Sequence, residues 1–258
     1  MKLSIIIAAY NVEKYIEKCV KSCYDENLQD NYEIIVVNDG SLDGTVKILE
    51  SLIREVKNLK IISKENEGLG AARNTGIANA NGTYIWMIDG DDFLTDEFIP
   101  ILIQHIKEEV IDVFKLNYNI TSENGEILSV KYSNEQKTWH TGSIYYEEHY
   151  SDSYTWQYVF KKSLFDENQL KFKDRINMQD SEIMPKIMYF TEKVKYLGLV
   201  GYNYRQQQTS FTNSQNPEKR LKYFESIISG KRALENFSID VQTKESVLYG
   251  AILEKIKS

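Results

Sequence analysis

The first 120 residues alternate short apolar runs with longer segments in which apolar side chains recur every three to four positions. The short runs predict buried β-strands at 3–9, 33–37, 59–63, 84–88 and 111–117. The longer segments predict amphipathic helices at 12–24, 45–56, 70–80 and 96–108. Because strands and helices take turns along the chain, this region predicts βαβ crossovers and an α/β fold, with a mostly parallel sheet flanked by helices on both faces.

The pattern changes after about residue 120. Asn124-Gly125 lies between polar strand-like runs and predicts a β-hairpin. An aromatic-rich stretch from Trp139 to Phe165 follows, and it suits either a packed core or a platform on which sugar rings stack. From 217 onward, two amphipathic helices are predicted at 217–237 and 243–256, forming a C-terminal helical extension. We therefore divide the chain into 1–120, 121–216 and 217–258.

Composition and charge narrow the class of protein. The chain has 258 residues, 42% of them hydrophobic, and only 3 prolines, so it can build a full hydrophobic core. With 31 basic and 38 acidic side chains the net charge is −7, which argues against nucleic-acid binding because no excess of positive charge exists to neutralise phosphates. Cys19 and Cys23 share one face of a predicted helix and are expected to be core thiols in a reducing, cytoplasmic protein.

Membrane association is expected to be peripheral at most. No apolar run approaches the roughly 18 residues that span a bilayer. Basic side chains gather in the C-terminal helices, at Lys219, Arg220, Lys222, Lys231 and Arg232. This cluster fits either a solvated helix face or a surface that approaches anionic lipid headgroups at the inner face of the membrane.

Polar clusters follow four of the predicted strands, each where the strand ends. They are Tyr10-Asn11, Asn38-Asp39-Gly40-Ser41, Glu65-Asn66-Glu67-Gly68 and Asp89-Gly90-Asp91-Asp92. Ligands of parallel sheets bind beyond the carboxyl ends of the strands. The four clusters are therefore expected to share one edge of the sheet and to form a ligand site.

The segment Asp89-Gly90-Asp91-Asp92 places three carboxylates within four positions. Carboxylates this close repel one another and raise one another's pKa unless a cation joins them. Hard oxygen ligands suit Mg²⁺ or Mn²⁺, and Gly90 lets the backbone bend so that both flanking carboxylates face one ion. The alternative is structural: Asp91 or Asp92 caps the following helix, or the segment is an acidic turn.

Two further groups on this edge suit a nucleotide. Asp39 ends a buried strand, where its carboxylate can accept hydrogen bonds from the edge of a nucleobase. Gly68-Leu69-Gly70-Ala71-Ala72-Arg73 is a weak match to the dinucleotide fingerprint, because Arg73 replaces the third small residue and the motif follows the third strand. A nicotinamide cofactor is therefore not expected. The glycines still allow close backbone approach, and Arg73 can aim its guanidinium at a nucleotide.

Four ordered segments together resemble family 2 glycosyltransferases with the GT-A fold. They are Ser4 to Asn11, Asn38 to Thr45, Asn66 to Gly76 and Asp89 to Asp92. The resemblance implies an inverting hexosyl- or N-acetylhexosaminyltransferase of the bacterial polysaccharide type. It further implies a nucleotide-diphosphate sugar as donor, most often a UDP-sugar, Mn²⁺ or Mg²⁺ as cofactor, and a saccharide or lipid-linked acceptor. Residues 1–120 would then bind the nucleotide sugar, and 121–216 the acceptor.

The same resemblance assigns roles to single residues in the first half. Asp39 would bind the base, Asp89 the ribose or the metal, and Asp91 the metal. Arg73 would lie near the nucleotide, and its pocket would be lined by Ala8, Tyr10 and Asn11. Position 8 is usually proline in the family, and here it is Ala8.

The second half resembles the family more loosely. Thr155 to Phe165 resembles a tryptophan-led segment beneath the acceptor, which gives Trp156 its expected role. Gln179-Asp180 resembles a Glu-Asp pair whose Asp is the general base. Tyr202 to Arg205, followed by Ser210, resembles a stretch that closes over the diphosphate, so Arg205 and Ser210 are expected near the acceptor or diphosphate.

The assignment of Asp180 as the base meets one departure from the family pattern and two alternatives. Gln179 departs from the family's Glu and leaves one carboxylate where the family has two. Asp180 has a structural alternative as the N-cap of a helix at 181–189. Glu182 would be the base if the register of the loop differs.

Two rival functions remain. A nucleotidyltransferase would need a basic, glycine-rich loop near the N-terminus, but the segment Ala8 to Asn11 contains no Gly, Lys or Arg. A non-catalytic module that binds a nucleotide sugar or a glycan would hold UDP with metal and would release none from a donor. Release of UDP from a donor in the presence of an acceptor therefore distinguishes an enzyme from a binding module.

Overall fold

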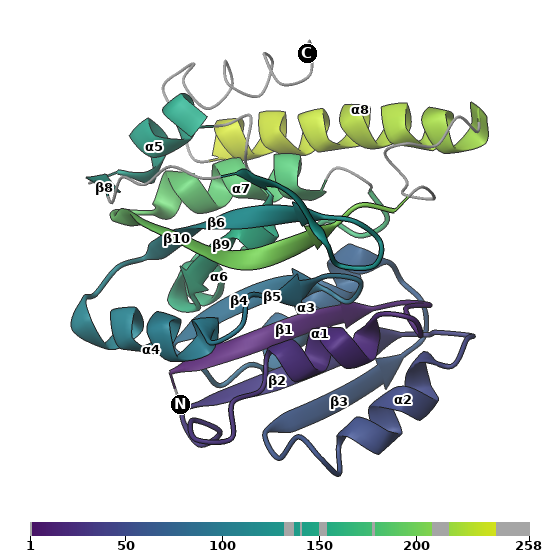
Figure 1. The fold of residues 1–258 in the computed structure, drawn as a ribbon. Helices are drawn as coiled ribbons and strands as arrows, with labels where there is room; N and C mark the ends of the chain where they lie inside the picture. The colour runs from purple at the N-terminus through teal and green to yellow at the C-terminus, as the bar shows by residue number, and fades with distance from the viewer. Residues whose placement is uncertain are drawn as a thin grey trace.

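One mixed β-sheet runs through the molecule, with helices on both sides (Figure 1). The computed structural model describes residues 2–131, 137–139, 141–149, 154–176, 179–207 and 217–240, with the backbone alone at 217–224 and 238–240. The strands are β1 (Leu3–Ala9), β2 (Tyr32–Asp39), β3 (Leu59–Lys64), β4 (Tyr84–Asp89), β5 (Phe93–Leu94), β6 (Val113–Thr121), β7 (Ile127–Lys131), β8 (Lys137–Trp139), β9 (Tyr158–Lys161) and β10 (Val194–Arg205). The helices are α1 (Ile16–Ser22), α2 (Thr45–Leu52), α3 (Leu69–Asn79), α4 (Phe98–Glu108), α5 (Gly142–His149), the short 3-10 helix η2 (Thr155–Gln157), α6 (Ser163–Glu167), α7 (Gln179–Phe190) and α8 (Pro217–Asp240).

The sheet has a parallel half and a mixed half. Its order is β3-β2-β1-β4-β9-β6-β10-β5, and the pairs among β3, β2, β1 and β4 are all parallel. Beyond β4, β9 is inserted antiparallel to both β4 and β6, whereas β6 and β10 run parallel. The α/β sheet flanked by helices is confirmed, and its parallel part is the region in which strands and helices alternate along the sequence.

The sheet is buried on both faces because successive side chains of its central strands point to opposite sides. Leu3, Ile5 and Ile7 of β1 belong to one core, which also contains buried residues of α1, α2 and α4. Ile6 and Ala8 belong to a second core, which contains buried residues of α3, α5, α6 and α7. Near-continuous apolar strands are the expected consequence of such two-sided burial.

The hairpin predicted at Asn124-Gly125 is present. β6 and β7 pair antiparallel, and Gly125 lies between them with φ +90°. Few residues other than glycine adopt such a backbone conformation without strain.

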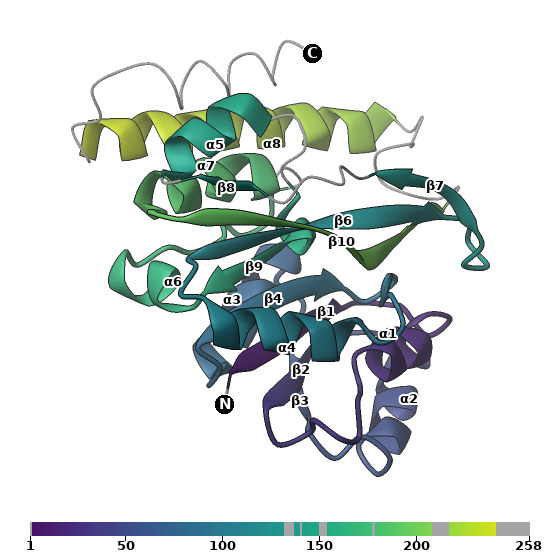
Figure 2. The ribbon, with the colours of Figure 1, turned by 60° about the vertical axis from the view of Figure 1, so that its left-hand side comes forward.

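Helix α8 forms an outer layer over α7, together with α5 (Figures 1 and 2). Of the apolar stripe predicted for this helix, Leu234 is buried as expected, whereas Ile228 is 53% exposed and the neighbouring Ser226 is buried instead. Gly230 of α8 faces Glu182 of α7, because a Cβ on this glycine would lie 3.8 Å from the Cβ of Glu182.

The lipid-binding hypothesis for the C-terminal helices stays a prediction. The side chains of Lys219, Arg220 and Lys222, and the second helix predicted at 243–256, lie outside the described residues. Among the helices that the structure describes, none combines the length and apolarity that a bilayer crossing requires. Vesicle flotation would test peripheral binding, and a protein that stays unbound to anionic vesicles at low salt would contradict it.

Candidate functional site

The carboxyl ends of β2, β1 and β4 meet at one edge of the sheet, as predicted. In the register of the parallel strands Ala8 pairs with both Val37 and Asp89, and Asp39 pairs with Lys64 on β3. The polar segments that follow these strands therefore lie side by side. The structure thus brings Asp89 beside Ala8, although the two residues are 81 positions apart in the sequence.

Asp39 is a buried carboxylate with a fixed orientation. Its two oxygens accept hydrogen bonds from the backbone N–H groups of Glu67 (3.1 Å) and Gly68 (2.8 Å), and Lys64 lies 3.4 Å away. Gly68 adopts φ +95° at the start of α3, which suits glycine. Asp39 thus orders the turn that precedes α3, and its role toward a nucleobase stays a prediction.

The loops after β1 and β2 are tied to each other. The side-chain oxygen of Asn11 accepts a hydrogen bond from the N–H of Leu42 (2.8 Å), and the N–H of Asn11 donates to the Ser41 hydroxyl (3.0 Å). Asn11 has φ +53°, in the left-handed region that asparagine tolerates better than most residues. Tyr10 beside it is exposed, so its ring is available to line a pocket.

Position 90 has no room for a side chain. Its N–H donates to the carbonyl of Ala8 (3.0 Å), and a Cβ at this position would lie 2.8 Å from that same oxygen. The backbone between Asp89 and Asp91 therefore packs directly on the end of β1. Glycine is thus needed at position 90 for lack of space, in addition to the backbone bend expected from the sequence.

Asp91 has an electrostatic environment that favours a nearby cation. Burial, followed by the charge of Asp89, raises the pKa of Asp91 to about 6. The amide of Gln207 donates to one of its oxygens (2.8 Å). A carboxylate pair that repels in a desolvated position is stabilised when a metal ion joins it.

Asp92 is a buried carboxylate to which the sequence argument gave no role beyond a possible cap. It accepts hydrogen bonds from the Tyr202 hydroxyl (2.7 Å) and from the backbone N–H of Arg205 (2.7 Å). Burial and the charges of Asp91 and Asp89 raise the pKa of Asp92 well above its usual value. Asp92 thus fastens the acidic motif to β10.

The capping interpretation of Asp91 and Asp92 is wrong. Helix α4 begins at Phe98, its cap residue is Glu97, and no side chain caps it by a hydrogen bond. The acidic motif ends several residues before the helix, so its carboxylates bond elsewhere.

Arg205 is buried under the acidic motif. Its Nε donates to the carbonyl of Asp91 (2.7 Å), and a second nitrogen donates to the carbonyl of Glu123. Its guanidinium also packs over the rings of Tyr15 and Phe93. These contacts make Arg205 a support for the motif, and contact with a diphosphate stays a prediction. Ser210 lies outside the described residues.

Arg73 connects the acidic motif with the predicted base. Its side chain is only 2% exposed, and its guanidinium donates to Asp89 (2.9 Å) and to Asp180 (3.2 Å). The ring of Phe172 lies 5.3 Å from its central carbon. The sequence placed Arg73 near the nucleotide; the structure places it between two carboxylates that are 91 positions apart in the chain.

The glycine-rich start of α3 accommodates a neighbouring loop. A Cβ on Gly70 would lie 2.6 Å from the carbonyl oxygen of Lys173. Asn74, one turn later, bonds both the N–H (2.9 Å) and the carbonyl (2.8 Å) of Phe172. These contacts hold the loop before α7 against α3, which brings Asp180 within reach of Arg73.

Asp180 is the second residue of α7, and its side chain is 23% exposed. One carboxylate oxygen, Oδ1, accepts hydrogen bonds from Arg73 and from the hydroxyl of Thr155 (2.7 Å). The predicted helix begins before Asp180, at Gln179, so the N-cap interpretation of Asp180 is wrong. No role for Thr155 is predicted from the sequence, where it only precedes Trp156.

Glu182 lies in a different environment from Asp180. It is buried, forms an ion pair with Lys186, and packs beside Gly230 of α8. Two residues along a helix rotate a side chain by about 200°, which turns Glu182 away from the direction of Asp180. This geometry favours Asp180 as the candidate base.

The aromatic-rich stretch is mostly core. Trp156 is only 4% exposed, and its ring stacks on Tyr202 (4.5 Å between centroids) and on Tyr154 (5.4 Å). Tyr154 is 45% exposed, and Tyr204, which also stacks on Trp156 (5.5 Å between centroids), is partly exposed. Trp156 thus lies beneath rings that reach solvent, and its role toward an acceptor stays a prediction.

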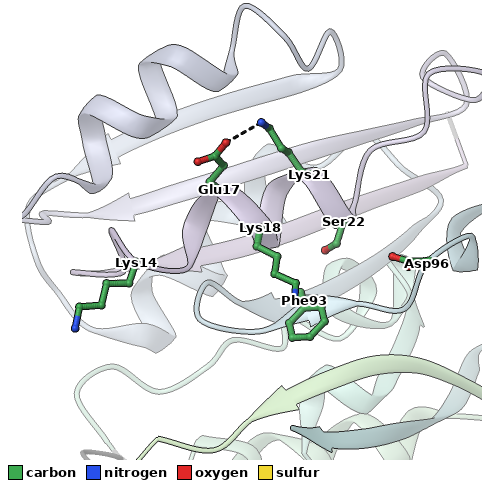
Figure 3. A pocket seen from close by; sticks show the side chains of 7 residues that line it. All are labelled: Lys14, Glu17, Lys18, Lys21, Ser22, Phe93 and Asp96. Carbon is green, nitrogen blue, oxygen red and sulfur yellow. Dashed lines mark hydrogen bonds and ion pairs between the residues drawn. The ribbon is translucent and has the colours of Figure 1, made fainter. Parts of the chain in front are cut away.

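A further pocket lies beside α1, and one of its lining residues, Phe93, packs under the guanidinium of Arg205. It has a volume of about 520 Å³ and is lined by Lys14, Lys18, Lys21, Phe93 and Asp96, among others (Figure 3). Lys18 lies over the ring of Phe93, at 3.7 Å from its centroid. None of the residues assigned to the candidate site lines this pocket.

Comparison with known proteins identifies relatives over most of the chain. The family profile described as glycosyl transferase family 2 matches residues 4–177. Glycosyltransferase GlyA of Streptococcus pneumoniae is 32% identical over 223 residues, which cover 82% of this chain and 31% of that protein. The uncharacterized glycosyltransferase EpsJ of Bacillus subtilis is 31% identical, over 81% of this chain and 62% of its own length. The chain thus spans less than two thirds of the length of these curated relatives.

Solved structures show the same fold. Residues 1–349 of S. aureus TarS in complex with UDP-GlcNAc match with a TM-score of 0.78 and 20% sequence identity, over 99% of this chain and 72% of the other. The same TarS fragment in complex with UDP matches with a TM-score of 0.68. The GT-A fold expected from the sequence is confirmed.

Proposed function

The chain belongs to glycosyl transferase family 2, and from this premise we propose that it is an inverting glycosyltransferase. It would move a sugar from a UDP-sugar to a hydroxyl group of a saccharide or lipid-linked saccharide. Asp180 would be the general base, and Asp89 and Asp91 would hold Mn²⁺ or Mg²⁺.

One observation carries this proposal: Arg73 joins Asp89 of the acidic motif to Asp180 through a single buried guanidinium. An inverting transfer needs a group that stabilises the departing diphosphate and a base on the acceptor side, held at a fixed separation. Arg73 gives both carboxylates one common support. Carboxylates that lie near one another only by chance on a surface would not need a buried arginine between them, as Asp89 and Asp180 have.

The acidic motif fits a divalent cation. Desolvation of Asp91 and the neighbouring charge of Asp89 raise the pKa of Asp91, and carboxylate oxygens are the ligands that Mg²⁺ and Mn²⁺ prefer. Among the described residues no group of three or more His, Cys, Asp or Glu side chains converges on one point. Mg²⁺ typically takes ligands from substrate phosphates as well as from one or two carboxylates.

The chain's own residues would act on the acceptor. Asp180 would take the proton from the acceptor hydroxyl while Arg73 keeps the carboxylate in place. The acceptor oxygen forms a bond to the anomeric carbon, and the electron pair of the breaking bond leaves with the diphosphate. A bound Mn²⁺ or Mg²⁺ supplies positive charge that stabilises this leaving group.

The neighbours suggest a first donor to test. TarS has been crystallised with UDP-GlcNAc, so UDP-N-acetylglucosamine is the starting choice among UDP-sugars. A screen that measures UDP release from several UDP-sugars, with and without saccharide acceptors, tests the proposed function. UDP release that depends on an acceptor supports it, whereas tight UDP binding without release under any condition would favour a non-catalytic module.

We predict that nucleotide binding depends on metal. Without a cation, the carboxylates of the acidic motif repel a diphosphate, so UDP affinity should fall at least about tenfold in EDTA. Asp91→Asn should reduce the gain in affinity that Mn²⁺ provides. Titration calorimetry of UDP binding measures both effects.

Asp166→Asn is the matched control, because Asp166 is an exposed carboxylate of α6 that pairs with Lys162, the residue before the helix. Equal UDP affinity in EDTA and in Mn²⁺ would contradict the metal assignment.

A further inference from the structure

Thr155 contacts the candidate base directly. It opens η2 and is completely buried. Its hydroxyl donates to Oδ1 of Asp180 at 2.7 Å, and Arg73 donates to the same oxygen at 3.2 Å. Two donors of different chemistry thus converge on one of the two carboxylate oxygens.

The second oxygen, Oδ2, accepts no hydrogen bond from the residues that the structure describes, and the side chain keeps 23% of its surface exposed. A carboxylate held by one oxygen cannot rotate about its Cβ–Cγ bond without losing both bonds. The two donors therefore determine which oxygen is left to receive a proton.

We propose that Thr155 is a positioning residue that fixes the carboxylate of Asp180, so that Oδ2 faces the acceptor hydroxyl and receives its proton. This inference rests on the proposed function, because it takes Asp180 as the base. Thr155 would act only through Asp180 and would not contact the substrate.

The segment that carries Thr155 is held by the sheet. The carbonyl of Trp156 accepts a hydrogen bond from the indole N–H of Trp86 (2.8 Å), and Trp86 lies on β4. The same strand ends in Asp89. Because β4 supports both Thr155 and Asp89, the hydroxyl that orients the base is placed by the same strand that places the acidic motif.

The energetic reason for a hydroxyl here is the charge of its partner. A hydrogen bond to a charged group contributes more than one between neutral groups. Valine has almost the shape of threonine but cannot donate, so Thr155→Val leaves the packing and removes one of the two bonds on Oδ1. Arg73 alone would then hold the carboxylate, which can rotate about the remaining contact.

The test compares Thr155→Val, Thr155→Ser and Thr155→Ala in steady-state transfer with the donor found by screening. We expect Thr155→Val to lower kcat about 10- to 100-fold, with the KM for the donor nearly unchanged, which is the size of effect that a hydrogen bond to a charged group provides. Thr155→Ser, which keeps the hydroxyl, should restore most of kcat, whereas Thr155→Ala should not. Thr191→Val is the matched control, since it removes a buried hydroxyl that bonds the carbonyl of Ile187 near the far end of α7.

The double variant Thr155→Val with Asp180→Asn separates this inference from the proposed function. If Thr155 acts through Asp180, the double variant transfers sugar no more slowly than Asp180→Asn alone. An inactive Asp180→Asn with a fully active Thr155→Val would overturn the positioning role and leave the base intact. An active Asp180→Asn would overturn the base and with it this inference. A further loss of rate in the double variant would also overturn the positioning role of Thr155. Equal rates for Thr155→Ser and Thr155→Ala would overturn it as well. If Thr155→Val does not fold, the comparison of the Ser and Ala variants alone tests the inference.

Discussion

Asp180→Asn is expected to abolish nearly all sugar transfer while the protein keeps its donor affinity and its melting temperature. A general base contributes about 10²- to 10⁴-fold in rate, so kcat should fall by that factor. Asparagine retains an oxygen that can accept the bonds from Thr155 and Arg73, and it has nearly the same shape as aspartate. What it lacks is the ability to take a proton.

The measurement combines steady-state kinetics with calorimetry of UDP binding and a thermal melt of each variant. Asp174→Asn is the matched control, because Asp174 is an exposed carboxylate in the loop that precedes α7. A kcat for Asp180→Asn within a factor of two or three of the wild type would remove Asp180 as the base. Glu182 would then be the next residue to test, although its pairing with Lys186 beside α8 argues against it.

The parallel half of the fold could be predicted from the sequence because its strands are buried on both faces. Such strands are continuous apolar runs, and β1 was predicted at its observed limits, Leu3–Ala9. The polar residues that end these strands then had to meet at one edge of the sheet. This rule predicts that Asp39 and Asp89 lie at a common edge of the sheet, and the strand register places β2 and β4 on either side of β1, as expected.

The mixed half could not be predicted in the same way. β9 enters between β4 and β6 as an antiparallel strand, and its partners lie tens of residues away in the sequence. No local pattern encodes such a pairing. The aromatic-rich stretch was likewise ambiguous, since only the packing against Tyr202 shows that Trp156 belongs to the core.

The contacts within the site have the same long-range origin. Thr155 meets Asp180 across 25 positions, and Asp92 meets Tyr202 across 110. A buried threonine before a tryptophan has no distinguishing mark in a single sequence. The sequence could therefore name the charged groups of the candidate site, whereas the neutral groups that orient them required the structure.

Arg73→Met is expected to cause the largest loss of stability among the site variants. Methionine keeps a long, flexible apolar side chain over Phe172 but leaves the carboxylates of Asp89 and Asp180 without their shared cation. Removal of one partner from a buried ion pair costs about 3–5 kcal/mol, and because both carboxylates retain about a quarter of their exposure, we expect about 3 kcal/mol here. Urea unfolding measures this free energy.

Arg73→Lys should lie between the wild type and Arg73→Met, because lysine keeps the charge but a single ammonium replaces the planar guanidinium that reaches both carboxylates. Arg54→Met, at an exposed position after α2, is the control for loss of an arginine charge and should change the unfolding free energy by less than about 0.5 kcal/mol. If Arg73→Met is as stable as this control, the buried guanidinium does not hold the two carboxylates together. In that case the observation that carries the proposed function loses its force, because Asp89 and Asp180 would keep their places without a common support.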